Sequence, residues 1–323
     1  MRNFLFTQRR LSRREFLEIA IHETTMMALL ANCKRSPESF LAPESSLDKK
    51  IGQMFVVGFR GLEVNDNHPI IKDIKMGNLG GVILFDYDFL TQKPVRNIGA
   101  PEQLKTLIEK LQDASPATPL FIAIDEEGGR VSRLIKKIGS SSAASAQDLG
   151  TINDLALTRK SSKTIAKTLA QYGINLNLAP VVDININPEN PIIGKLKRSF
   201  SDDPKIVTEH ALEFIKVHHQ HGVLCTLKHF PGHGSSTGDS HRGLVDITLS
   251  WSQVELQPYT NIIETGEIDA IMTAHVFNAT LDYKHPATLS KAIITNLLRE
   301  KLNYHGVVIS DDADGRYCQL LWL

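Results

Sequence analysis

The stretch from Lys228 to His241 holds residue types and a spacing suited to proton transfer. It begins with a cation and an imidazole, Lys228 and His229, and it ends with Asp239-Ser240-His241. An aspartate two residues from a histidine can accept one ring N–H, fix the tautomer and raise the basicity of the imidazole. The other ring nitrogen is then left for proton transfer. Taken alone, the Asp239–His241 pair is also compatible with an ordinary polar loop that contains a capped turn.

Short apolar runs alternate with segments of helical spacing from about residue 50 onward, which predicts a parallel sheet with right-handed crossovers. The strand runs are nearly continuously apolar, as expected for strands buried on both faces. The predicted strands are Gln53–Phe59, Gly81–Phe85, Leu120–Ile124, Asn175–Val182, Val223–Lys228, Ala270–Ala274 and Gly306–Ser310. The predicted helices are Pro101–Gln112, Asn153–Tyr172, Pro204–His219 and Leu289–Leu302, the last with Thr288 as its cap.

Seven strands fit either an open doubly wound sheet or a barrel that lacks its last unit. No GxGxxG motif follows the first strand, so a dinucleotide-binding fold has no support. In a barrel, catalytic residues lie at the carboxyl ends of the strands, and ionisable residues stand at most of these positions here. They are Asp86, Asp88, Asp125, Glu126, Glu127, Asp183, Lys228, His229, His275, Asp311 and Asp312.

Several of these polar residues also have a purely structural interpretation. Asp125 and Asp183 could cap helices or accept from backbone amides, and we prefer that interpretation for Asp183. Arg133 and Arg198 could be partners in structural ion pairs, and His275 could be a packed barrel histidine. The three histidines near the end of the third predicted helix are interpreted as solvated surface; they are His218, His219 and His221.

The segment KHFPGHGSSTGDSH resembles the signature of the β-N-acetylglucosaminidases of glycoside hydrolase family 3, including its four-residue gap. Other segments resemble the family in the same order, so the resemblance spans roughly residues 50–312. These segments are IDEEGGRVSRL, NLAPVVDININP, the stretch from Gly194 to Phe200, IMTAHV, PATLS and GVVISDD. The resemblance implies a (β/α)8 TIM-type barrel and retaining hydrolysis of terminal β-linked N-acetylglucosamine, without a cofactor or a metal ion.

The resemblance also assigns roles to individual residues. Asp311 matches the nucleophile, which forms a covalent glycosyl-enzyme, and His241 matches the general acid/base, with Asp239 as its orienting partner. The residues that match substrate contacts are Asp125, Arg133, Arg198, Lys228 and His229. The substrates expected from the resemblance are small β-N-acetylglucosaminides such as the muropeptides of peptidoglycan.

The sequence departs from the family pattern at two places. Glu126 stands where the family commonly has glutamine, and family character ends abruptly after Asp312, with 12 residues following Asp311. We therefore expect an incomplete barrel in which the eighth β/α unit is missing. A chain of this kind could also be an inactive remnant that binds sugar without turning it over.

The N-terminal residues differ in character from the rest of the chain. Residues 12–17 resemble a twin-arginine export signal, and the run that ends at Cys33 loosely resembles a lipoprotein cleavage site. We therefore divide the chain into a leader, residues 1–45, and a barrel domain, residues 46–323. The leader predicts export to the periplasm or a lipid anchor at Cys33; without signal function the protein would be cytoplasmic.

The charge balance and the length of the apolar runs argue against nucleic acid as a partner and against a membrane-spanning helix. The 36 basic residues balance the 36 acidic ones, which argues against nucleic acid. No run of 18 apolar residues is present, so no transmembrane span is expected. One other enzyme class fits the histidine spacing, a metal-dependent barrel hydrolase that uses His229, His233 and His241. The aglycone, the choice between hydrolysis and transfer to phosphate, and the oligomeric state cannot be deduced.

Overall fold

The main sheet of the protein is parallel and curled, as seen in a computed structural model that describes residues 46–88, 91–115, 118–135, 137, 143–241 and 243–312. Within these residues the sheet has seven strands in the order β1-β2-β3-β6-β7-β9-β11, each pair parallel. The strands are β1 (Val56–Gly58), β2 (Gly81–Ile83), β3 (Phe121–Ile124), β6 (Leu176–Asn177), β7 (Leu224–Phe230), β9 (Ala270–Thr273) and β11 (Val307–Ser310). Every predicted strand is present, although most are shorter than predicted.

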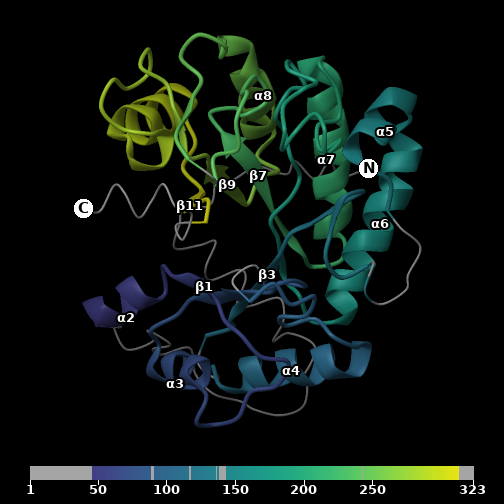
Figure 1. Cartoon of the computed structure of the whole chain (residues 1–323), viewed down its shortest axis with the longest axis vertical. Coiled ribbons are helices and arrows are strands. Elements are labelled where there is room, and N and C mark those ends of the chain that lie inside the picture. The colour runs from purple at the N-terminus through teal and green to yellow at the C-terminus, as the bar shows by residue number, and fades with distance from the viewer. Residues whose placement is uncertain are drawn as a thin grey trace, which may run out of the picture.

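Helices surround this sheet in the manner of a TIM-like barrel. Figure 1 shows α3 and α4 on the opposite side of the molecule from α7 and α8, with the strands between them. The helices are α2 (Leu47–Gly52), α3 (Pro69–Met76), α4 (Pro101–Asp113), α5 (Ala146–Ile152), α6 (Leu155–Gln171), α7 (Pro204–His219), α8 (Gln257–Thr265) and the π-type η3 (Ala292–Lys301), with short 3-10 turns η1 (Gln253–Leu256) and η2 (Ala287–Leu289). No pairing joins β11 to β1 in the described residues, so the sheet there is an incomplete barrel.

Two small sheets lie outside the main one and shape the loops that follow the strands. The first is the antiparallel pair β4 (Glu126–Gly128) and β5 (Val131–Ser132), directly after β3. The second is the parallel pair β8 (Val245–Asp246) and β10 (Val276–Phe277). Each pair therefore holds one of the loops in which the predicted site residues lie.

Helix α7 shows how local sequence sets these elements. Pro204 occupies its first turn, and the Asp203 side chain caps it by accepting from the Lys205 amide at 2.8 Å. The predicted bounds of this helix are confirmed. The last turn, however, packs inward, and His218 is fully buried with its ring 4.0 Å from that of Phe214. The prediction of a solvated surface is therefore wrong for His218.

Two further predictions concern His219 and His221 at the surface and Thr288 as the cap of the last predicted helix. His219 and His221 are both partly buried, and His219 Nε2 lies 2.7 Å from Asp269 Oδ2, so neither is as fully solvated as predicted. Ser290 rather than Thr288 caps η3, because its Oγ accepts from the Ile293 amide at 3.0 Å. The Thr288 hydroxyl instead donates to the Ala274 carbonyl at 2.9 Å, so the predicted cap is wrong.

The predicted leader, residues 1–45, and the tail beyond Asp312 lie outside the described residues, so the predicted domain division stays a prediction. No helix in the described part of the chain is long and apolar enough to cross a membrane.

Candidate active site

Four of the predicted substrate contacts form one network of charges at the carboxyl ends of β3 and β7. Lys228 Nζ lies 2.8 Å from Asp125 Oδ1 and 2.7 Å from Glu127 Oε1. Arg198 holds Glu127 with two parallel bonds, of 2.8 Å from Nε and 2.7 Å from Nη2. Arg133 donates to Asp125 Oδ2 at 3.1 Å. The network alternates positive and negative groups, and Glu127 stands at its centre.

Burial and pairing keep these groups charged. Although burial alone would raise the pKa of Glu127, the charges of Arg198 and Lys228 lower it to about 2. Burial acts in the same way on Asp125, and Lys228 and Arg133 hold its pKa well below the ordinary value. The Lys228 side chain is only 3% exposed. A rigid set of donors and acceptors of this kind can bind several hydroxyls of a sugar without rearranging.

Glu127 was not among the predicted site residues. A run of acidic residues after a strand was its only signal, and nothing in that run distinguishes Glu127 from its neighbours. The turn that follows explains why it points inward. Gly128 and Gly129 have φ angles of +88° and +56°, and an added Cβ on Gly129 would come within 2.5 Å of Ser145. The two glycines thus form a tight turn next to the charge network.

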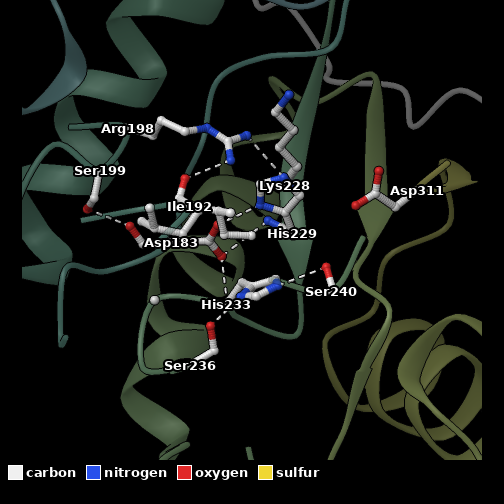
Figure 2. A network of polar contacts seen from close by, with 12 residues as sticks. Asp183, Ile192, Arg198, Ser199, Lys228, His229, His233, Ser236, Ser240 and Asp311 are labelled. Atoms are coloured by element: carbon white, nitrogen blue, oxygen red, sulfur yellow. Dashed lines mark hydrogen bonds and ion pairs between the residues drawn. The ribbon is translucent and has the colours of Figure 1, made fainter. Parts of the chain in front are cut away.

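Asp183 is the buried support of His229 and of the loop that follows β7. Its carboxylate accepts from His229 Nδ1 at 2.7 Å and from the backbone amides of His229 at 3.2 Å and His233 at 2.8 Å (Figure 2). The interpretation that Asp183 binds backbone amides is confirmed, but its bond to the His229 ring was not predicted. His229 Nε2 lies 3.3 Å from Arg198 Nη2, so the fifth predicted contact adjoins the charge network.

The three predicted catalytic residues also come together. His241 Nδ1 lies 3.1 Å from Asp239 Oδ1, and His241 Nε2 lies 3.8 Å from Asp311 Oδ1. Asp311 directly follows β11, and β9 lies between β11 and β7, the strand that carries Lys228 and His229. Asp311 is 9% exposed, and its Oδ1 accepts from the Asp312 amide at 2.8 Å. Asp311 Oδ2 is buried and has no hydrogen-bond partner among the described residues.

The charges of this pair reinforce each other. The Asp311 carboxylate, 3.8 Å from the ring, raises the pKa of His241 to about 9, against the opposing effect of burial. Burial would raise the pKa of Asp311, but the nearby His241 ring holds it well below the ordinary value. At neutral pH the pair is therefore an imidazolium next to a carboxylate.

The remaining polar residues at the strand ends have structural partners. Asp88 pairs with Arg60 at 2.5 Å, and His275 lies between the Thr288 hydroxyl, at 2.9 Å, and the Asp312 carbonyl, at 3.0 Å. For the metal alternative, no group of three or more His, Cys, Asp or Glu side chains that could hold a metal ion occurs among the described residues. Moreover, both ring nitrogens of His233 are bonded to serine hydroxyls.

Comparison with known proteins shows the family to which this chain belongs. The family profile described as "Glycosyl hydrolase family 3 N terminal domain" matches residues 46–316. The chain belongs to glycosyl hydrolase family 3. It is 38% identical over 258 residues to β-hexosaminidase A of Pseudoalteromonas piscicida, covering 73% of this chain and 41% of that protein. It is 34% identical to β-hexosaminidase LpqI of Mycobacterium tuberculosis, covering 82% and 65%. The family 3 chain thus spans less than two thirds of these relatives.

Solved structures of related proteins have the same fold as this chain. A family 3 β-N-acetylglucosaminidase from Paenibacillus superposes with a TM-score of 0.77 at 36% identity, over 86% of this chain and 51% of that one. A β-N-acetylhexosaminidase from Beutenbergia cavernae gives 0.76 at 30% identity, over 86% and 81%. These similarities confirm the family that the sequence motifs indicated and the TIM-like barrel fold.

Proposed function

We propose that this family 3 chain is a retaining β-N-acetylglucosaminidase that releases terminal β-linked N-acetylglucosamine from small glycosides such as peptidoglycan fragments. The observation that carries the proposal is the line Asp239–His241–Asp311, with 3.1 Å and 3.8 Å between successive polar atoms. The relatives named β-hexosaminidase support the substrate class. Export through residues 1–45 stays a prediction; one relative, 32% identical, is named a secreted glycosyl hydrolase from Arthroderma benhamiae.

The short separation of the two catalytic groups favours retention. In inverting glycosidases the two groups stand ~6.5–9.5 Å apart to admit a water, whereas retaining enzymes hold them closer. His241 Nε2 and Asp311 Oδ1 are 3.8 Å apart. That rule was drawn from carboxylate pairs, and its geometric reason applies equally to an imidazole. Direct attack on the sugar by the Asp311 carboxylate therefore fits the space.

The first step forms the glycosyl-enzyme. An Asp311 carboxylate oxygen bonds to C1 of the sugar, the bond from C1 to the glycosidic oxygen breaks, and His241 donates its proton to that oxygen. Asp125, Lys228, Arg133, Arg198 and His229 would hold the sugar hydroxyls and the C1 carbon in line. Because these groups are already fixed by one another, little ordering is required when substrate binds.

The second step uses the same pair with its charges changed. Once Asp311 is esterified it is no longer negative, so the main cause of the raised His241 pKa is removed. His241 then loses its proton more readily and can accept one from water, while the water oxygen bonds to C1 and the ester bond breaks. One histidine thereby acts as acid in the first step and as base in the second, as microscopic reversibility requires.

The direct test is release of nitrophenol from a 4-nitrophenyl β-N-acetylglucosaminide by the purified chain. We expect turnover that is unchanged by a chelator such as EDTA, because protein groups alone supply the acid and the nucleophile. Loss of activity on chelation would favour the metal-dependent alternative. Calorimetric binding of N-acetylglucosamine by a folded chain that releases no nitrophenol would favour the inactive-remnant alternative.

The pH profile of kcat/KM should carry the signature of His241. Its raised pKa of about 9 means that the proton donor is present below that pH and is lost as pH rises through it. We expect kcat/KM for N,N′-diacetylchitobiose to fall above about pH 9. A 2,4-dinitrophenyl glycoside should lack this basic limb, because its leaving group departs without a proton. The same limb with both substrates would assign the titration to another group.

A further inference from the structure

The loop that carries His241 is bound to the barrel through a buried histidine that the chemistry described above does not use. His233 is 0% exposed, and its Nδ1 lies 2.7 Å from Ser236 Oγ while its Nε2 lies 3.0 Å from Ser240 Oγ. Ser240 directly precedes His241 and is 1% exposed, whereas the His241 side chain is 46% exposed. The proposed acid/base residue is thus the exposed neighbour of a buried anchor, and Figure 2 shows His233 of that anchor between Ser236 and Ser240.

The hydrogen bonds of Ser236 and His233 determine which group donates and which accepts at each contact. Ser236 Oγ donates to the Gly238 carbonyl at 3.3 Å and accepts from Asn190 Nδ2 at 3.0 Å. Its hydrogen is therefore used, and His233 Nδ1 must donate to it. In the neutral imidazole the other nitrogen is then an acceptor. Burial lowers the pKa of His233 to about 4, so the ring is neutral at working pH. The Ser240 hydroxyl is accordingly the donor to His233 Nε2.

The base of the loop is immobilised by further buried contacts. Asp183 Oδ1 accepts from the His233 amide at 2.8 Å, and Glu255 Oε2 accepts from the Gly234 amide at 3.0 Å. At Gly234 an added Cβ would lie 1.7 Å from the Ile184 carbonyl oxygen, so the loop is packed directly on its support. Ser240 is therefore held by a ring that cannot itself move.

We propose that His233 is a positioning residue, which acts through the Ser240 hydroxyl to hold His241 within reach of the glycosidic oxygen and Asp311. The inference rests on the proposed glycosidase function and deepens it. Breaking the His233–Ser240 bond removes the buried contact next to His241, whose own bonds to Asp239 are exposed, while the charge network and Asp311 stay in place. The loss should then fall on proton transfer and spare sugar binding.

The test compares Ser240→Ala with wild type on two substrates that differ only in their need for an acid. For N,N′-diacetylchitobiose we expect kcat/KM to fall roughly tenfold or more, since acid catalysis is typically worth 10²–10⁴-fold. For the 2,4-dinitrophenyl glycoside kcat/KM should change less than about twofold, because it reports only formation of the glycosyl-enzyme. Azide, a nucleophile that needs no base, should restore kcat for the activated substrate in the variant.

A matched control and the melting temperature separate positioning from folding. Ser162→Ala removes another buried hydroxyl, 1% exposed and without a hydrogen-bond partner among the described residues, on helix α6 rather than on the loop that carries His241. It should leave both substrates unaffected. Equal losses on both substrates in Ser240→Ala, or no loss on either, would overturn the positioning role while leaving the glycosidase assignment intact. Inactivity of the wild type on both substrates would instead defeat the proposed function.

Discussion

Asp311→Asn is expected to lower kcat/KM for a 4-nitrophenyl β-N-acetylglucosaminide by on the order of 10³-fold or more, because the amide has no anionic oxygen to attack C1. The measurement is nitrophenol release under substrate-limited conditions. The adjacent variant Asp312→Asn is the matched control. The Asp312 carbonyl accepts from His275 Nε2 and its amide donates to Asp311 Oδ1, and both backbone bonds are kept in Asp312→Asn, so its activity should stay within a few-fold of wild type.

The same substitution makes a second, independent prediction about His241. The pKa of this histidine is raised to about 9 chiefly by the Asp311 carboxylate. Asp311→Asn removes that negative charge, so the His241 pKa should fall toward the ordinary value of ~6.5, as followed by the NMR titration of its ring protons. A histidine that still titrates near 9 in the variant, or full turnover by Asp311→Asn, would show that another carboxylate plays these roles.

Glu127→Ala is expected to cost about 3–5 kcal/mol of the free energy of unfolding, the usual penalty when one partner of a buried ion pair is removed. Lys228 and Arg198 would be left as buried cations that face each other without their shared carboxylate. Sugar binding should weaken as well, since both cations lose their fixed positions. Chemical denaturation and KM measure the two effects.

Acid pH should produce a similar effect in the wild type. The folded-state pKa of Glu127, about 2, lies below the unfolded value of ~4.3. Its contribution to stability is therefore present above about pH 4.3 and is lost as pH falls toward 2, about 3 kcal/mol in all. In Glu127→Gln this acid-induced loss should be smaller than in the wild type.

The neighbouring residue provides the control for both Glu127 measurements. Glu126 is also buried, but its Oε2 accepts only backbone amides, from Arg133 at 2.9 Å and Leu134 at 2.8 Å. Burial raises its pKa, and the bonds described for its Oε2 go to the backbone of the loop rather than to the cations of the network. Glu126→Gln keeps an acceptor oxygen and should leave KM unchanged. A loss of stability in Glu126→Gln as large as that in Glu127→Ala would mean that loop packing, and not charge pairing, dominates.

Much of the fold was readable from the sequence because its signals are local. Apolar runs located all seven strands of the described main sheet, and helical spacing predicted both ends of α7. The predicted strand Asn175–Val182 is the clearest overestimate, since β6 covers only Leu176–Asn177. Pro180 has no amide hydrogen to donate to a neighbouring strand, although the run around it is apolar.

Some features of the candidate site could likewise be predicted from the sequence, whereas others depend on the tertiary structure. The pairing of Asp239 with His241 lies within three residues, and the resemblance to the family pointed to the predicted contact residues, so the sequence was sufficient for both. Only the tertiary structure decided which charges pair across the sheet. Arg198 reaches Glu127 from 71 residues away, and Lys228 reaches Asp125 from 103. Residue periodicity reports which face of an element is buried, but not which distant loop that face meets.

The buried histidines make the same point. A histidine in a polar run has no preference that tells burial from exposure, so His218 was expected at the surface and His233 was considered as a metal ligand. Both are buried because specific partners satisfy their ring nitrogens, Phe214 O and Asn177 for one and two serines for the other. Those partners become neighbours only when the loops pack. The support of the proposed acid/base is therefore a property of the folded chain and not of any one segment.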